Sequence, residues 1–347
     1  MNIHKIESNI DSDILRIELF LSNQCNYSCW YCFPGFNEGT HLWPKLDKVI
    51  PNLSHLLDYY KKHKNKKRFI LHIIGGEPTL WKDLGKFVQY FKENYNVIIS
   101  MSSNGSRTLR WWEKYGEYFD HVILSTHHER ADVPHIRNVA DILYKKKVWV
   151  NATVLMDQFA WDKCLDNIEQ LRKSKFRWPI TAIAVDHQKI NYTPEQKQFF
   201  KFSLKRIPWP WYYIQCKRLP HKISTIYFNN GKKKKVPHNW MKLNGYNFFK
   251  GWDCNIGIDT MFIDKNGELR GACGSKLFNL DFHYNIFDDD FVKTFNPDLQ
   301  PQTCPFDCCK CMPEINCSKE LKDASLKEEC QPRKYTNLSY IPLVLKE

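Results

Sequence analysis

The chain has 347 residues, 43% of them hydrophobic, which is enough for one large domain or for one large and one small domain. It contains no apolar run of about 18 residues and no basic-then-apolar N-terminal signal, which excludes helical membrane proteins and secreted proteins. The sequence therefore predicts a soluble, cytoplasmic protein without a membrane partner.

Lysine and arginine outnumber aspartate and glutamate by 51 − 38 = 13. Lysine-rich runs at 61–68, 145–147 and 232–235 carry much of this excess. They fit a binding surface for phosphate, nucleic acid or an acidic redox partner, and equally an ordinary solvated face. No zinc-finger, RRM or KH signature is present, so nucleic acid is an alternative partner that no sequence motif supports.

The first 190 residues alternate strand-like and helix-like segments. The expected strands are 14–22, 68–76, 96–105, 121–128, 147–156 and 180–187. Helical periodicity marks 80–95 and 161–174, and a further helix is expected at 192–207. Apolar strands that alternate with helices predict a parallel sheet covered by helices. Six such units favour an α/β fold, a partial (β/α)6 TIM-like barrel, over a short open sheet.

Four polar segments directly follow expected strands: "CNYSCWYC", "GGEPT", "SSNG" and "STHHE". Because the chemistry of such folds lies at the carboxyl ends of the strands, we expect these segments to meet at one rim.

The pattern changes after about residue 191, and cysteines become frequent again after 250. We expect a core at 1–207, an irregular connection at 208–250 and a small cysteine-rich C-terminal domain at 251–347. About 13 residues precede the first expected strand, which leaves no room for an N-terminal domain that binds a leader peptide.

Thirteen cysteines in an intracellular chain favour metal ligation or catalysis over disulfides. Cys25, Cys29 and Cys32 are spaced C-x3-C-x2-C in one loop. Three thiolates on a cubane cluster leave one iron open to an outside ligand, whereas zinc needs a fourth protein ligand and the loop contains no histidine.

The stretch "CNYSCWYC" resembles the C-x3-C-x-φ-C motif of the radical SAM superfamily, with Tyr31 as the aromatic residue φ. The resemblance implies that the three cysteines hold a [4Fe–4S] cluster whose fourth iron binds S-adenosylmethionine (SAM). Reductive cleavage of SAM then gives a 5′-deoxyadenosyl radical that abstracts hydrogen from a substrate. The cofactor supplies this chemistry, and the protein positions it.

Two further segments resemble motifs of the same family. "GGEPTL" resembles its "GGEP" motif, which implies that Gly75, Gly76, Glu77 and Pro78 bind the methionine part of SAM. "SSNG" resembles the polar segment that contacts the ribose or carboxylate, which assigns Ser103 and Asn104 to SAM. Ser125 has a similar place after the fourth strand. An ordinary turn at "SSNG" and a structural role for Ser125 remain open.

The second cysteine set begins with "CNIGIDTMFIDKNGELRGAC", which predicts a hairpin with a cysteine near each end. Together with the later "CPFDCCKCMPEINC", it resembles the SPASM and twitch extensions of radical SAM proteins, which carry one or two auxiliary [4Fe–4S] clusters. The chain departs from the full SPASM pattern, because Leu321 stands where a cysteine is expected and five residues separate Gly267 from the next cysteine, where the pattern has four.

The resemblance implies one auxiliary cluster on Cys254, Cys273, Cys308 and Cys311. Cys317 and Cys330, together with Cys304 or Cys309, are candidates for a second cluster or a zinc site. A zinc knot or free thiols remain the alternative for the whole set.

Several other residues are candidates with an equally ordinary structural interpretation. Cys164 and Cys216 are candidate hydrogen donors to a substrate radical, although Cys164 fits a core position. The segment 127–129, Asp186 and His187 follow strands and are candidate substrate or proton-transfer groups. The aromatic segment 209–213 fits packing or a substrate platform.

The sequence thus predicts a radical SAM oxidoreductase that acts on a small molecule such as a sugar. The alternatives are a maturase of ribosomally made peptides, an RNA-modifying enzyme and a non-catalytic metal-binding adaptor. The expected partners are the substrate and an electron donor such as a flavodoxin or ferredoxin.

Overall fold

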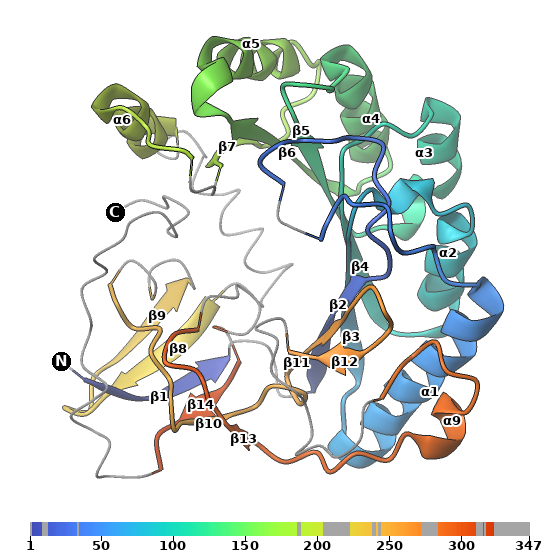
Figure 1. Cartoon of the computed structure of the whole chain (residues 1–347), viewed down its shortest axis with the longest axis vertical. Coiled ribbons are helices and arrows are strands. Elements are labelled where there is room, and N and C mark those ends of the chain that lie inside the picture. Colours follow the sequence, from blue (N-terminus) through green and yellow to red (C-terminus); the bar gives the residue numbers. More distant parts are fainter. Residues whose placement is uncertain are drawn as a thin grey trace.

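The structure is a computed structural model that describes residues 2–8, 13–32, 35–185, 189–203, 223–237, 241, 244–271, 284–309, 315 and 317–322. These residues form two sheets (Figure 1). The eight-stranded sheet runs in the order β12-β11-β2-β3-β4-β5-β6-β7, and the six-stranded sheet in the order β13-β10-β14-β1-β8-β9.

The larger sheet confirms the α/β class, the parallel sheet and the six expected strands in chain order. Its strands are β2 (Ile14–Phe20), β3 (Arg68–Ile74), β4 (Val97–Ser103), β5 (His121–Thr126), β6 (Trp149–Met156) and β7 (Ile180–Ala184). Each pairs in parallel with the next. In the described residues the sheet does not close on itself, which agrees with a partial barrel.

Helices follow the strands and cover one face of this sheet, as Figure 1 shows. They are α1 (Leu46–Lys64), α2 (Leu84–Asn94), α3 (Leu109–Tyr115), α4 (Val133–Lys145), α5 (Trp161–Arg172), α6 (Pro194–Ser203) and the short α9 (Phe291–Thr294). Local chemistry sets their ends: the Asp132 carboxylate accepts from the His135 backbone N–H at the start of α4, with Pro134 in the first turn. Asn65 adopts a left-handed conformation, φ 50°, where α1 ends.

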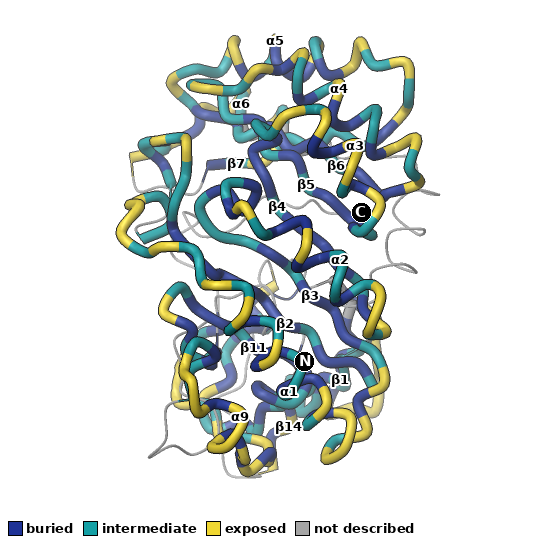
Figure 2. Tube along the Cα trace, turned by 90° about the vertical axis from the view of Figure 1, so that its right-hand side faces the viewer, coloured by how far each residue is buried: buried dark blue, intermediate teal, exposed yellow. Residues whose placement is uncertain are grey.

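The two faces of the sheet differ in polarity. On β2, Leu15, Ile17 and Leu19 are fully buried in the core that the helices share. Figure 2 shows this core as a buried band of strands beneath more exposed helices. Each such leucine or isoleucine stabilises the fold by about 1.5–3 kcal/mol. The alternate residues Arg16 and Glu18 point to the face without helices, because side chains alternate along a strand.

The smaller sheet is built from both ends of the described chain. Its strands are β1 (Ile3–Ser8), β8 (Ile223–Phe228), β9 (Lys233–Pro237), β10 (Asp253–Cys254), β13 (Gln302–Thr303) and β14 (Lys319–Glu320). Ile6 of β1 pairs with Ile226 of β8 and with Lys319 of β14. The expectation that the first strand begins near Ile14 is therefore wrong. β1 is stabilised by partners so distant in sequence that its own pattern gives no sign of them.

The expected hairpin after Cys254 is present and joins the larger sheet. β11 (Thr260–Ile263) pairs antiparallel with β12 (Leu269–Arg270) and parallel with β2. Gly267 in the turn has φ +87°, which favours glycine. Beneath this edge, the buried Lys66 Nζ donates to the Ile14 carbonyl at 3.0 Å and lies 3.5 Å from Asp259 Oδ1.

The lysine run at 232–235 is exposed around the β8–β9 turn, as a solvated face requires. Within the part of the chain that the structure describes, no helix is both long and apolar enough to cross a bilayer.

Candidate active site

The cysteine loop leaves the carboxyl end of β2. Cys29 is buried, and Cys25 and Cys32 are half-buried. The Cys32 N–H donates to the Cys29 carbonyl at 3.1 Å, and the Tyr27 N–H donates to Cys25 Sγ at 3.3 Å. Burial raises the pKa of Cys25, and burial together with the nearby Glu129 raises the pKa of Cys29 to about 12. These thiols are protonated until a metal ion displaces the protons.

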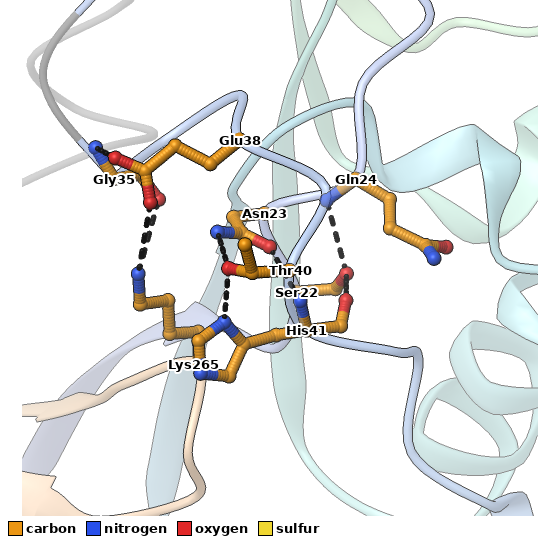
Figure 3. Close-up of polar contacts among 8 residues, drawn as sticks. All are labelled: Ser22, Asn23, Gln24, Gly35, Glu38, Thr40, His41 and Lys265. Atoms are coloured by element: carbon orange, nitrogen blue, oxygen red, sulfur yellow. Dashed lines mark hydrogen bonds and ion pairs between the residues drawn. The ribbon is translucent and has the colours of Figure 1, made fainter.

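Hydrogen bonds close the base of this loop (Figure 3). Asn23 Nδ2 donates to Thr40 Oγ1 at 2.9 Å, and the Asn23 Oδ1 accepts from the His41 N–H at 2.9 Å. Ser22 Oγ donates to the His41 carbonyl at 2.6 Å. Lys265, in the β11–β12 turn, reaches the loop from the side, since its Nζ lies 3.4 Å from the Gly35 carbonyl oxygen and 3.9 Å from a Glu38 carboxylate oxygen. The loop is therefore held at both its base and its far side.

The glycines of "GGEP" let the β3 loop press against the start of the cysteine loop. The Gly76 N–H donates to the Ser22 carbonyl at 3.2 Å, and the Glu77 N–H donates to the Gln24 carbonyl at 2.7 Å. A Cβ on Gly75, φ +144°, would lie 2.5 Å from the Ser22 oxygen, and one on Gly76 would lie 2.1 Å from the Gln24 oxygen. Only glycine permits this approach, and Pro78 then begins a single 3-10 turn, Pro78–Leu80.

Glu77 is fully buried and joins two of the polar segments. Its Oε1 accepts from the Thr79 N–H, Thr79 Oγ1 and Ser103 Oγ at 3.0, 2.7 and 2.7 Å, and its Oε2 accepts from the Asn104 N–H at 2.6 Å. All four partners donate, as an ionised carboxylate requires, although burial raises the pKa of Glu77 above its usual value. The described contacts make Glu77 a clamp between the β3 and β4 loops, and its contact with SAM stays a prediction.

Asn104 carries the link on to the cysteine loop. Its Nδ2 donates to Asn26 Oδ1 at 2.8 Å, and Asn26 Nδ2 donates to Ser106 Oγ at 2.9 Å. The structure thus brings "CNYSCWYC", "GGEP" and "SSNG" together at one rim. Ser125, near the end of β5, is half-buried on the face without helices.

The segment 127–129 lies against the cysteine loop. The Tyr31 hydroxyl is 3.1 Å from His127 Nδ1, and the two rings stack at 5.9 Å. Trp30 Nε1 donates to Asp157 Oδ2 at 2.8 Å, and His128 Nε2 lies 3.7 Å from the same oxygen. Both residues between Cys29 and Cys32 are therefore fixed by the β5 and β6 loops, so that the cysteine loop has four neighbouring loops as supports.

Burial, with the neighbouring His128, lowers the pKa of His127 from 6.5 to about 4. The unfolded chain therefore binds more protons than the folded chain between these values. The stability that His127 contributes is complete above pH 6.5 and is lost as the pH falls towards 4. We expect His127→Gln to remove about 3 kcal/mol of pH-dependent stability across this window. Urea unfolding of the metal-free proteins at pH 7 and pH 4.5 measures it, and equal losses for both proteins on acidification would contradict it.

A second group of polar residues was missed in the sequence. Glu18, His72, Ser100 and His121 occupy one register across β2 to β5, on the face without helices. His72 Nδ1 lies 2.6 Å from Ser100 Oγ, and its Nε2 lies 4.0 Å from Glu18 Oε2. The sequence does contain a sign of this group, because each residue is a polar residue at an alternate position of an otherwise apolar strand, on the face without helices.

The inner face stays polar on the last strands. Thr181 Oγ1 donates to Asn151 Oδ1 at 3.1 Å, and Asn151 Nδ2 donates to Thr153 Oγ1 at 3.2 Å. A parallel sheet buried on both faces is normally apolar on both. In this sheet the face without helices instead carries polar side chains.

The remaining candidates lie elsewhere or outside the described residues. Cys164 is fully buried in the core of α5, where its Sγ donates to the Leu155 carbonyl at 3.3 Å and burial raises its pKa to about 11. That position fits packing better than hydrogen donation. The candidates Asp186, His187, Cys216 and the segment 209–213 lie outside the described residues.

The structure describes five cysteines of the second set: Cys254, Cys304, Cys308, Cys309 and Cys317. Three others lie outside the described residues: Cys273, Cys311 and Cys330. Cys308 Sγ accepts from Asn247 Nδ2 at 3.1 Å. Cys254 and Cys317 are buried together in the larger core. In the described ranges, no three His, Cys, Asp or Glu side chains converge on one point as ligands of a single ion do. A cubane instead binds each thiolate on its own iron.

Residues 19–186, the segment that contains the sheet, the cysteine loop and the loops that support it, match the family model of the radical SAM superfamily. The chain belongs to the radical SAM superfamily. Its cofactors are accordingly a [4Fe–4S] cluster and SAM, and the three thiols of the cysteine loop fit that cluster.

Curated relatives match about a third of the chain. An S-adenosylmethionine-dependent nucleotide dehydratase of Siniperca chuatsi is 30% identical over 132 residues, which are 35% of this chain and 35% of that protein. A radical SAM cyclopropyl synthase of Paramaledivibacter caminithermalis is 28% identical over 117 residues, 30% of this chain and 24% of that protein. The chain thus spans about a third of the length of these relatives, or less.

Solved structures are also similar to this chain. That of anSMEcpe with bound AdoMet has 16% sequence identity and a TM-score of 0.48, and it covers 82% of this chain and 81% of its own. That of Streptococcus suis SuiB bound to S-adenosylmethionine has 13% identity and a TM-score of 0.48, and covers 82% and 64%.

Proposed function

We propose that this radical SAM enzyme is an oxidoreductase that abstracts hydrogen from a small polar molecule bound against the inner face of its sheet. The observation that carries the proposal is the polar register of Glu18, His72, Ser100 and His121, which lies below the cysteine loop. When bound, the reduced cluster and SAM supply the 5′-deoxyadenosyl radical.

The chain's own residues divide the remaining work. Cys25, Cys29 and Cys32 hold the cluster, and the backbone at Gly75 and Gly76 forms the wall against which SAM binds. Glu77 fixes the β3 and β4 loops through its four hydrogen bonds. Each loop is thereby set before SAM arrives, which lowers the entropy lost on binding.

The inner face favours a sugar-like substrate. Neighbouring strands lie about 4.8 Å apart, so the register offers imidazole, hydroxyl and carboxylate groups at short, regular spacing. His and Ser side chains can both donate and accept. A molecule with several hydroxyl groups matches such a surface better than an apolar one does.

We further propose that the cysteine-rich region beyond residue 250 holds an auxiliary [4Fe–4S] cluster and is SPASM- or twitch-like. The β11–β12 hairpin between Cys254 and Cys273 supports this. An auxiliary cluster can accept the electron left after hydrogen abstraction, which suits a dehydrogenation.

The first experiment counts iron and sulfide in anaerobically reconstituted protein. The Cys25→Ala/Cys29→Ala/Cys32→Ala variant should lose about four irons and all 5′-deoxyadenosine formation with dithionite and SAM. Cys164→Ala, which changes a core thiol outside the loop, is the control and should keep its iron. Zinc in place of iron, or no 5′-deoxyadenosine from fully loaded wild type, would refute the assignment.

The substrate class is tested with an extract of deuterium-labelled cells that make the protein, separated at about 1 kDa. Deuterium transferred to 5′-deoxyadenosine from the low-mass fraction supports a small molecule. Transfer from the high-mass fraction alone indicates a peptide or RNA substrate and contradicts the proposal.

A further inference from the structure

Two cysteines far apart in sequence lie side by side beneath the edge of the larger sheet. Cys254 of β10 is the register partner of Lys319 in β14, and the Asn255 N–H donates to the Ser318 carbonyl at 2.9 Å. This pairing places Cys317 beside Cys254, close enough for a hydrogen bond between the two thiols. Both are buried, with exposed fractions of 5% for Cys254 and 0% for Cys317.

Polar and charged groups surround the pair, although it lies in a hydrophobic core. Thr260 Oγ1, at the start of β11, lies 2.8 Å from Cys317 Sγ. Lys319 is 3% exposed and its Nζ donates to the Cys317 carbonyl at 3.1 Å. Asp259 Oδ2 accepts from the Ser318 N–H at 3.1 Å, and its Oδ1 faces the buried Lys66.

Two cations are buried near these sulfurs, since Lys319 Nζ donates to the Cys317 carbonyl and Lys66 lies beside Asp259. Thiolates that ligate a metal centre carry negative charge, and nearby cations stabilise that charge. The surroundings of the pair therefore suit thiolate ligands.

The other described thiols of this region belong to a different environment. Cys309 packs with Phe249 and Trp252 in the core of the smaller sheet, and Cys308 accepts its hydrogen bond from Asn247. The resemblance to the twitch layout implies that Cys254, Cys273, Cys308 and Cys311 form one ligand set. Cys273 and Cys311 lie outside the described residues, and within the described residues Cys317 lies beside Cys254.

We propose that Cys254 and Cys317 are ligands of one auxiliary iron–sulfur cluster, so that Cys317 belongs with Cys254 and not to a separate second site. This inference rests on the proposed auxiliary cluster and assigns two of its ligands. The described part of the chain brings no third His, Cys, Asp or Glu side chain to the pair.

The position of the pair also limits its role. Thr260 is the register partner of Arg16, near the amino end of β2, whereas the cysteine loop leaves the carboxyl end. Phe20 lies four residues beyond Arg16 along β2, a span of about 13 Å. A cluster at this pair would therefore lie toward the amino end of β2, at the opposite end of that strand from the cysteine loop, a place suited to receiving an electron through the protein and unsuited to touching SAM.

The test uses the chain without its SAM-cluster cysteines, Cys25→Ala/Cys29→Ala/Cys32→Ala, so that the remaining iron belongs to auxiliary sites. Into it we would place Cys254→Ser, Cys317→Ser and both together, with Cys164→Ser as the control. Iron, sulfide and the EPR spectrum of the dithionite-reduced protein are measured after anaerobic reconstitution. Circular dichroism checks that each variant is folded, and serine keeps the size of the side chain.

We expect each single variant to lose about four irons or to alter the same EPR signal, and the double variant to lose no further cluster. Two separate signals, one lost with each cysteine, would overturn the proposal. So would an unchanged cluster in Cys317→Ser, or a Cys254–Cys317 disulfide in anaerobically isolated wild type. Failure of the proposed function gives a different result from failure of this ligand assignment. In that case, protein that retains the loop cysteines forms no 5′-deoxyadenosine.

Discussion

Glu77→Ala should lower the free energy of unfolding by about 3–5 kcal/mol, because it leaves four buried donors without their acceptor. The donors on Thr79, Ser103 and Asn104 lie where water does not reach them easily, since all three residues are buried. The β3 and β4 loops lose the group that joins them, so the affinity for SAM should fall as well. Urea unfolding and SAM binding by calorimetry measure the two effects.

Two further substitutions show whether the clamp is responsible. Glu77→Gln keeps one acceptor oxygen but turns an NH2 group toward a donor, so its loss should be intermediate. Glu93→Ala removes an exposed glutamate from α2 and should change stability by less than about 0.5 kcal/mol. If Glu77→Ala were no more harmful than Glu93→Ala, the clamp would have no energetic role.

Gly76→Ala should abolish 5′-deoxyadenosine formation, because the added methyl group has no room beside the Gln24 backbone. The added Cβ would lie 2.1 Å from the Gln24 carbonyl oxygen and 2.4 Å from its carbon, both backbone atoms that no side-chain rotation can move. The β3 loop must then separate from the segment that leads into Cys25, which breaks the hydrogen bonds to Ser22 and Gln24. Iron content, SAM affinity and 5′-deoxyadenosine yield should all be measured on the folded variant.

Gly39→Ala is the matched control, since it lies in the same cysteine loop. A Cβ there meets nothing within 4 Å, and the change costs only the strain of φ +70°, about 1 kcal/mol. It should keep both iron and activity. Equal losses from Gly39→Ala and Gly76→Ala would point to general fragility of the loop and would count against the close approach at Gly76.

The sequence predicts most of the larger sheet because its information is local. Each strand is a short apolar run followed by a helix, and parallel order follows from that alternation. The rim could be predicted for the same reason: Gly76, Glu77 and Asn104 directly follow strands. The partners of Glu77 could not, since the hydrogen bonds from Ser103 and Asn104 depend on how the two loops pack.

The smaller sheet and the second cysteine set depend on distant pairing. Spacing shows the nearness of Cys308 and Cys311 in the sequence, whereas the nearness of Cys254 and Cys317 depends on the pairing of β10 with β14. Nothing in the residues near Cys254 encodes that register. The polar inner face is an intermediate case, because Glu18 and His72 occupy visible alternate positions, yet their contact appears only when β2 and β3 are aligned.

The first two strands of the chain pair with strands that are synthesised much later, and this affects folding on the ribosome. β2 forms an internal strand only when β11 pairs with it, and β1 has no partner until β8 and β14 are made. At about 5–20 residues per second, roughly 12–50 s pass between the completion of β2 and that of β11. During this time the nascent sheet presents an open edge, the kind of surface that invites aggregation. A chaperone that covers this edge during synthesis would limit such aggregation.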